Sequence, residues 1–158
     1  MQTFLPHGPD FAASAQALDQ KRLNKQGVES YQILRTLAGV TQGWKNHPAV
    51  IMWRGHESTL FDYSKAIYNE IRKRDYKADL LVKIEETYNS HFTTTDAPAW
   101  LNDQRLSITH RGRLWVKNPE HYWLYEPQGQ IYEQYVCCPK CLYFWPSHEA
   151  RNLAQANA

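Results

Sequence analysis

Residues 46–74 read NHPAVIMWRGHESTLFDYSKAIYNEIRKR and carry the clearest structural pattern in the chain. From about Ser58 to Arg74 the buried-type positions recur at the spacing of one helix face: Leu60, Phe61, Ser64, Ile67, Tyr68 and Ile71. A short apolar run opens at Pro48 and ends at Gly55, residue types that are common at a helix start and in a turn. The stretch therefore predicts a turn that leads into a long amphipathic helix.

Helical patterning also appears on both sides of this stretch. Asp10 is suited to cap a helix through Phe11, Ala17 and Leu18, which could extend to Leu23. Further amphipathic segments cover residues 28–37, ending before Gly39, residues 80–88, and residues 104–117, bounded by Pro119. Whether Gly27 separates the first two helices or lies within one of them stays open. Residues 92–103 are expected to form a loop, and a short strand is expected near residues 131–136.

These patterns predict a mainly α protein. We expect a single compact helical domain over residues 1–150, with an aromatic and irregular C-terminal arm and a frayed tail over residues 151–158. A chain of 158 residues is long enough to bury a substantial core. Its ordinary apolar content excludes a disordered chain.

The sequence contains no signal-peptide pattern and no apolar run near the roughly 20 residues of a membrane span. Three cysteines confined to residues 137–141 do not form a disulfide framework. A monomer without membrane contact is therefore expected in the cytoplasm, or in the host cytoplasm if a phage encodes the chain.

Basic residues gather in clusters although the net charge is only +2. The clusters are Lys21, Arg22 and Lys25; Arg72, Lys73 and Arg74; and Arg111, Arg113 and Lys117. Any one of them could be a solvated face. Together with the many aromatic residues they favour nucleic acid as the partner.

His56 lies where the turn delivers it to the start of the long helix. A helix start offers unpaired backbone N–H groups and the positive end of the helix dipole, which suit a phosphate. The alternative is a histidine that only caps the helix and packs beside Trp53.

The spacing of Pro48, Gly55, His56 and Asp62 resembles the central motif of the pyrimidine-dimer DNA glycosylases, also called endonuclease V. Arg113, Leu114 and Lys117 match an Arg-Leu-x-x-Lys element of the same family. The opening MQTFLPHGPDFAASAQALDQKRLNKQGVESYQIL, together with NHPAVIMWRGHE, is similar to uncharacterised bacterial and phage relatives. The resemblance covers about residues 1–125 and returns at residues 144–146.

The resemblance implies base excision from double-stranded DNA. An amine attacks the sugar carbon, the base leaves, and a Schiff base forms that permits strand cleavage, so AP lyase activity is possible. A carboxylate assists, and base flipping exposes the bond. Arg113 and Lys117 are then expected to grip phosphates, with Lys21, Arg22, Lys25 and Arg111 as further DNA contacts.

The catalytic groups depart from the family pattern. The family uses an N-terminal threonine amine, whereas this chain begins with Met1 and Gln2, and a side chain as large as glutamine normally leaves Met1 in place. An α-amino group has a reference pKa of about 8 and is partly neutral near pH 7, so the Met1 amine is the candidate nucleophile. An ungapped alignment puts Asn24 at the carboxylate position, and Glu29 is the nearest replacement. Lys21 and Lys25 are alternative amines.

Cys138, Cys141 and His148 could supply ligands to a structural zinc ion, although packed free thiols remain the alternative, and no other cofactor is expected. Trp123 and Tyr125, close to Lys117, are candidates for base stacking. The leading hypothesis is thus a DNA glycosylase with Met1, Glu29 and His56 as its catalytic residues, His56 anchoring the helix start near the DNA strand. The alternatives are a catalytically inactive DNA-binding module on the same fold, or a related enzyme acting on RNA or nucleotides.

Overall fold

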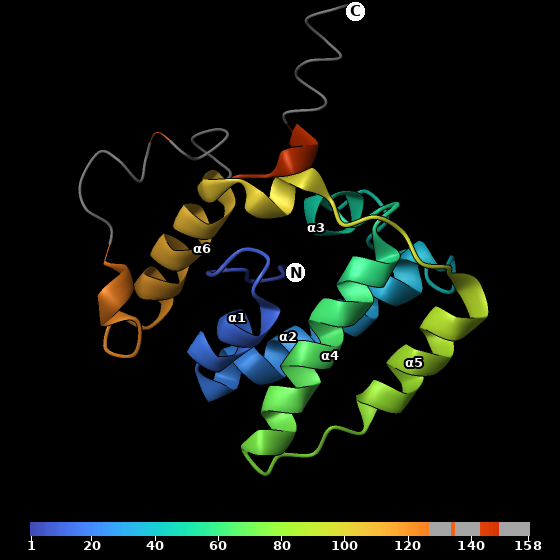
Figure 1. Cartoon of the computed structure of the whole chain (residues 1–158), viewed down its shortest axis with the longest axis horizontal. Helices are drawn as coiled ribbons and strands as arrows, with labels where there is room; N and C mark the ends of the chain where they lie inside the picture. The colour runs from blue at the N-terminus through green and yellow to red at the C-terminus, as the bar shows by residue number, and fades with distance from the viewer. Residues whose placement is uncertain (127–133, 135–142, 149–158) are drawn as a thin grey trace, which may run out of the picture. The chain divides into compact units, whose positions relative to one another are not determined.

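The computed structural model describes residues 1–126, 134 and 143–148, and every regular element in these residues is helical (Figure 1). The prediction of a mainly α protein is confirmed. The chain divides into two compact units. The first contains residues 1–4 and 10–98, and the second contains residues 5–9 and the described residues from 99 onward. A single domain over residues 1–150 stays a prediction.

The first unit is a set of helices packed around α2 and α4. Its elements are α1 (Phe11–Ala17), α2 (Gln20–Leu37), α3 (Pro48–Ile51), α4 (Glu57–Lys73) and α5 (Leu80–His91). Helix α4 packs against α1, α2 and α5, and α2 also contacts α3 and α5. The fully buried side chains between them include Leu23, Ile33, Leu34, Trp53, Leu60, Tyr63, Ile67 and Ile84.

The break between α1 and α2 lies at Leu18 and Asp19. Asp10 caps α1 as predicted, accepting a hydrogen bond from the Ala13 N–H, and Asp19 caps α2 by accepting one from the Arg22 N–H. Leu23 therefore belongs to α2. Gly27 lies within this helix, where a Cβ atom would come within 2.9 Å of the Tyr68 hydroxyl. Glycine at this position permits the close approach of α2 to α4.

Helix α4 begins at Glu57, one residue before the predicted start. Gly55 precedes it with a φ of 82°, a value that favours glycine, and the Glu57 carboxylate accepts a hydrogen bond from the Gly55 N–H. Near the other end of α4, Arg74 donates to the backbone oxygens of Leu18 and Gln16 at 2.8 and 3.0 Å. Arg74 therefore joins α4 to the end of α1.

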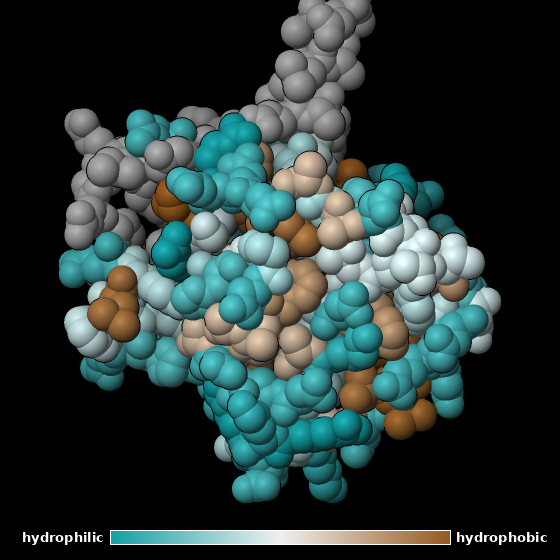
Figure 2. Space-filling view, in the orientation of Figure 1, coloured by the Kyte–Doolittle hydropathy of each residue, from teal (hydrophilic) through white to brown (hydrophobic). Residues whose placement is uncertain are grey.

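The surface of this unit varies along its helices (Figure 2). Hydrophilic residues cover the end of α4, where Arg72 and Lys73 are exposed. Hydrophobic colour gathers over the start of α5, where Val82 is 54% exposed. No helix in the described part of the chain is long and apolar enough to span a membrane.

The second unit contains η1 (Ala99–Asn102), α6 (Gln104–Lys117) and η2 (Trp123–Tyr125). The bounds predicted for α6 are confirmed, with Asp103 accepting a hydrogen bond from the Arg105 N–H as its cap. The expectation of a plain loop over residues 92–103 is wrong at its end, because residues 99–102 form a 3-10 turn. The strand expected near residues 131–136 falls, apart from Gln134, outside the described residues.

Candidate active site

The Glu29 carboxylate is the centre of a buried polar cluster at the N-terminus. Glu29 is 7% exposed and lies on α2. Its Oε1 atom is 3.5 Å from the Met1 amine and 3.7 Å from the Lys25 Nζ. Its Oε2 atom accepts hydrogen bonds from the Gln2 N–H and the Gln26 Nε2 at 3.3 and 3.2 Å. The structure thus brings together Met1 and Glu29, the nucleophile and carboxylate predicted from the sequence.

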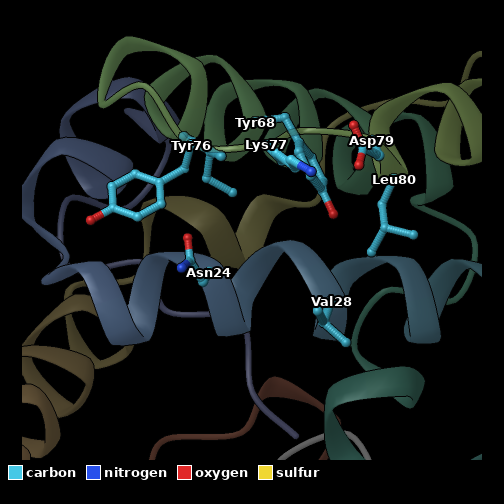
Figure 3. Close-up of a pocket in the computed structure, with 8 residues that line it drawn as sticks. Asn24, Val28, Tyr68, Tyr76, Lys77, Asp79 and Leu80 are labelled. Atoms are coloured by element: carbon cyan, nitrogen blue, oxygen red, sulfur yellow. The ribbon is translucent and has the colours of Figure 1, made fainter.

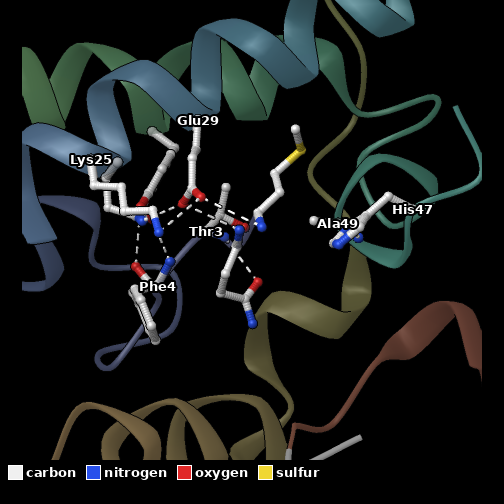
Figure 4. A network of polar contacts seen from close by, with 10 residues as sticks. Thr3, Phe4, Lys25, Glu29, His47 and Ala49 are labelled. Atoms are coloured by element: carbon white, nitrogen blue, oxygen red, sulfur yellow. Dashed lines mark hydrogen bonds and ion pairs between the residues drawn. The ribbon is translucent and has the colours of Figure 1, made fainter. Parts of the chain in front are cut away.

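One turn of α2 supplies most of this cluster. Lys25 and Gln26 lie four and three residues before Glu29, so both side chains can reach its carboxylate on the same side of the helix. Figure 4 shows Lys25 and Glu29 extending from α2 toward the N-terminal segment, where Thr3 and Phe4 lie. Residues 1–4 therefore bind to side chains that project from one short stretch of α2.

Side-chain hydrogen bonds fix the N-terminal segment, whose Gln2, Thr3 and Phe4 are buried. The Phe4 N–H donates to the Gln26 Oε1 at 2.7 Å. The Trp53 Nε1 donates to the Thr3 hydroxyl at 3.0 Å. These bonds define where the Met1 amine lies relative to Glu29.

Gln26 connects this segment to the core through its amide oxygen. The Tyr63 hydroxyl lies 2.7 Å from the Gln26 Oε1 and 3.3 Å from the Phe4 carbonyl oxygen. Burial raises the pKa of the Tyr63 phenol well above its ordinary value, and the charge of Glu29 adds to this rise. Tyr63 therefore stays protonated and donates. Because the Gln26 Oε1 accepts from Phe4 and Tyr63, the Nε2 of the same amide is directed at Glu29.

His47 is a member of the site that the sequence analysis missed. It caps α3, with its Nδ1 accepting a hydrogen bond from the Ala49 N–H at 3.1 Å. Burial lowers the pKa of the His47 imidazole, the positive N-terminus lowers it further, and the Glu29 carboxylate acts in the opposite direction. In Figure 4 the His47 ring points toward the N-terminal network. The sequence feature that indicates its position is a histidine directly before Pro48, since a polar residue before a proline suits the start of a helix.

His56 lies at the start of α4, as the sequence predicted, and has contacts with another segment. Its Nδ1 is 3.2 Å from the Asp96 carbonyl oxygen. Nearby, the Ser58 hydroxyl donates to the Thr95 carbonyl oxygen at 3.0 Å. Both contacts hold the segment after α5 against the start of α4. A role of His56 at the DNA strand stays a prediction.

The three basic residues of α2 have different environments. Lys21 is exposed. Arg22 forms an ion pair with Asp19 at 3.0 Å, and Lys25 forms one with Glu29 while its side chain stays 67% exposed. Lys25 is therefore the basic residue of this group that shares the Glu29 Oε1 atom with the Met1 amine.

The basic residues of α6 also differ from one another in their contacts and exposure. The Arg111 guanidinium lies 3.4 Å from the carbonyl oxygen and hydroxyl of Ser107, one turn earlier. Arg113 lies with its guanidinium 5.9 Å from the Tyr143 ring centroid, and its buried Nε has no hydrogen-bond partner among the described residues. Lys117 is exposed in the last turn.

The predicted stacking residues are not equivalent. Trp123 is 67% exposed. Tyr125 is engaged within its own unit, because its hydroxyl lies 2.8 Å from the His7 Nε2 and its ring stacks on Tyr122 at 5.9 Å. Trp123 therefore offers the more accessible aromatic surface.

The predicted zinc ligands Cys138 and Cys141 lie outside the described residues. His148 is described, with its ring 6.4 Å from that of Trp145. Within the described ranges, no group of three or more His, Cys, Asp or Glu side chains is arranged to hold a metal ion. The zinc hypothesis stays a prediction.

Asn24, the residue aligned with the family's carboxylate, lines a pocket of about 440 Å³ on another face of α2. In Figure 3 its side chain points from α2 toward Tyr76. The remaining lining residues are Val28, Tyr68, Ile71, Lys77, Asp79 and Leu80. The carboxylate that contacts the N-terminus is thus Glu29, five residues further along the helix.

A sequence model of the family described as pyrimidine dimer DNA glycosylase matches residues 1–84, just over half of the 158 residues. The matched region contains Met1, Glu29, His47 and the other residues of the Glu29 cluster. No curated protein and no solved structure matches the chain.

Proposed function

Because the chain belongs to the pyrimidine dimer DNA glycosylase family, we propose that it excises a damaged or modified base from duplex DNA, with the Met1 amine as nucleophile. The observation that carries this proposal is the 3.5 Å distance between the Met1 amine and the Glu29 carboxylate. An amine beside a carboxylate is the pair of groups that this type of base excision requires.

The neutral amine attacks C1′ of the damaged nucleotide, and the base leaves with the electrons of the C1′–N bond. Glu29 lies where it can take the proton that the amine must release. Opening of the sugar ring then gives a Schiff base between Met1 and C1′. Loss of a proton from C2′ and release of the 3′ phosphate would cut the strand, which is the AP lyase step.

The neighbouring residues hold these two groups. Gln2 and Gln26 donate to one carboxylate oxygen of Glu29, which leaves the other directed at the amine. Lys25 is the second amine within reach of Glu29 and is the alternative nucleophile. The proposal assigns catalysis to Met1 because its amine is positioned by the buried segment, whereas the Lys25 side chain is largely exposed.

Borohydride trapping on ultraviolet-irradiated and unirradiated duplexes tests the reaction. Borohydride reduces a Schiff base to a stable amine, so a covalent protein–DNA product is expected with the irradiated duplex. Peptide mapping of that product should locate the DNA on Met1. Acetylation of the N-terminus should abolish trapping, whereas Lys25→Ala should leave it largely intact.

Glu29→Gln tests the carboxylate. Base release should slow by at least about a hundredfold, because the amide cannot accept the proton. Glu86→Gln is the matched control, since Glu86 is an exposed carboxylate on α5 outside the cluster.

Three other results have distinct meanings. A cross-link on Lys25 would reassign the nucleophile. Base release without a trapped product would identify water as the nucleophile and Glu29 as its base. Tight binding with neither release nor trapping would favour the DNA-binding module.

A further inference from the structure

Trp44 is an exposed aromatic residue in the turn between α2 and α3. It is 55% exposed, although tryptophan is usually buried in a small protein. The residues beside it, Gly43 and Lys45, are exposed as well. None of the steps of the proposed reaction uses this side chain.

The turn that carries Trp44 is fixed at several points. The His47 N–H donates to the Trp44 carbonyl oxygen at 2.9 Å. Arg54 donates from Nη2 to the Lys45 carbonyl oxygen at 3.1 Å. On the α2 side, the hydroxyls of Thr36 and Thr41 are 3.1 Å apart. The backbone of the turn is therefore held at Trp44 and Lys45.

Through Trp44, this turn contacts His47, a residue next to the Glu29 cluster. The Trp44 ring meets the His47 ring edge-on, with centroids 5.6 Å apart and planes at 78°. In Figure 4 the His47 ring points toward the N-terminal network, and the charges of the N-terminus and Glu29 act on its pKa in opposite directions. Trp44 thus lies one ring contact away from a side chain that belongs to the proposed active site.

We propose that Trp44 stacks on a DNA base next to the nucleotide that the Met1 amine attacks. This inference rests on the proposed function, since it places the DNA at that amine. An enzyme that flips a nucleotide must compensate for lost base stacking, and an aromatic ring can supply a stacking surface for any base. The exposed side chains of Lys45 and Arg54 flank the turn with positive charge, which suits the phosphates on either side of that base.

The test measures equilibrium binding to a duplex with a single cyclobutane pyrimidine dimer and to the same duplex undamaged. Trp44→Ala should weaken binding to the damaged duplex by about five- to 150-fold, the effect of losing one base–aromatic stack. Binding to the undamaged duplex, in which the bases stay stacked, should change by less than about twofold. Trp44→Phe should restore most of the affinity, because phenylalanine retains a ring.

Tyr76→Ala is the matched control. Tyr76 is an aromatic residue of the same unit that is 51% exposed, and it lines the pocket on the other face of α2. Its substitution should leave both affinities unchanged. Equal affinities of Trp44→Ala and the wild type for both duplexes would overturn the inference. Borohydride trapping by the wild type reports separately on the proposed chemistry, so the two failures are distinguishable.

Discussion

Acid should destabilise this protein through His110, which is fully buried in α6. Its Nδ1 accepts a hydrogen bond from the Leu5 N–H at 2.9 Å, and burial lowers its pKa from 6.5 to about 3. Below pH 6.5 the unfolded chain binds a proton at this residue, whereas the folded protein does not until about pH 3. The contribution to stability is therefore complete above pH 6.5 and is lost as the pH falls toward 3.

The loss of stability can be calculated from the gap between the pKa of His110 in the unfolded chain and its pKa in the folded protein. Each pH unit between the two pKa values corresponds to about 1.4 kcal/mol, so the loss between pH 7 and pH 5 is about 2 kcal/mol for this residue. His110→Asn removes the titrating ring and keeps an oxygen near the position of Nδ1, where it can accept from the Leu5 N–H. Urea unfolding at pH 7 and pH 5 measures the loss in each protein. The wild type should lose about 2 kcal/mol more than the variant, and equal losses would refute the reasoning.

The remaining predictions concern DNA contacts, zinc and packing. Arg113→Ala and Lys117→Ala should each weaken duplex binding in all sequences and reduce the log–log salt slope by about one unit; salt slopes equal to that of the wild type would remove both residues from the interface. If Cys138 and Cys141 bind zinc, the purified protein should contain near-stoichiometric metal and a chelator should lower its Tm, whereas metal-free protein of equal stability would indicate packed thiols. Gly27→Ala should lower the free energy of unfolding by about 1 kcal/mol, because overpacking against Tyr68 outweighs the gain in helix propensity. In the same unfolding assay the exposed substitution Asn24→Ala should not be destabilising, and a Gly27→Ala protein as stable as the wild type would mean that α2 and α4 separate at little cost.

Local patterns predicted most helices because each depends on neighbours in the sequence. The apolar spacing of α4, the Asp10 cap and the bounds of α6 all lie within a few residues of the element they define. The break before Gln20 was harder to place, because the Asp19 cap competes with a continuous helical pattern. Gly27 does not interrupt α2, and the reason is its packing against Tyr68, which lies on another helix.

The candidate site could be predicted only in part for a related reason. Glu29 was found as the nearest carboxylate to the expected position, and a resemblance supplied the idea of an N-terminal amine. The contacts that unite the site join Gln2 to Glu29, Phe4 to Gln26 and Thr3 to Trp53, which are 27, 22 and 50 residues apart. The spacing of apolar residues within a helix carries no information about pairs of residues so far apart in the sequence. His47 was missed because its role depends on where the N-terminus lies.

The way in which residues 1–4 are held has a consequence for folding. The Gln2 and Phe4 N–H groups donate to side chains of α2, and the Thr3 N–H donates to the Gln2 side chain. Phe4 contacts Gln26 on α2 and Tyr63 on α4, so its full set of contacts can form only after these two helices have packed. We expect the amide hydrogens of such a terminal segment to exchange by local opening, at a free energy below that of global unfolding. The exchange rate of the Phe4 amide would then report how often the proposed nucleophile leaves its place while the rest of the protein stays folded.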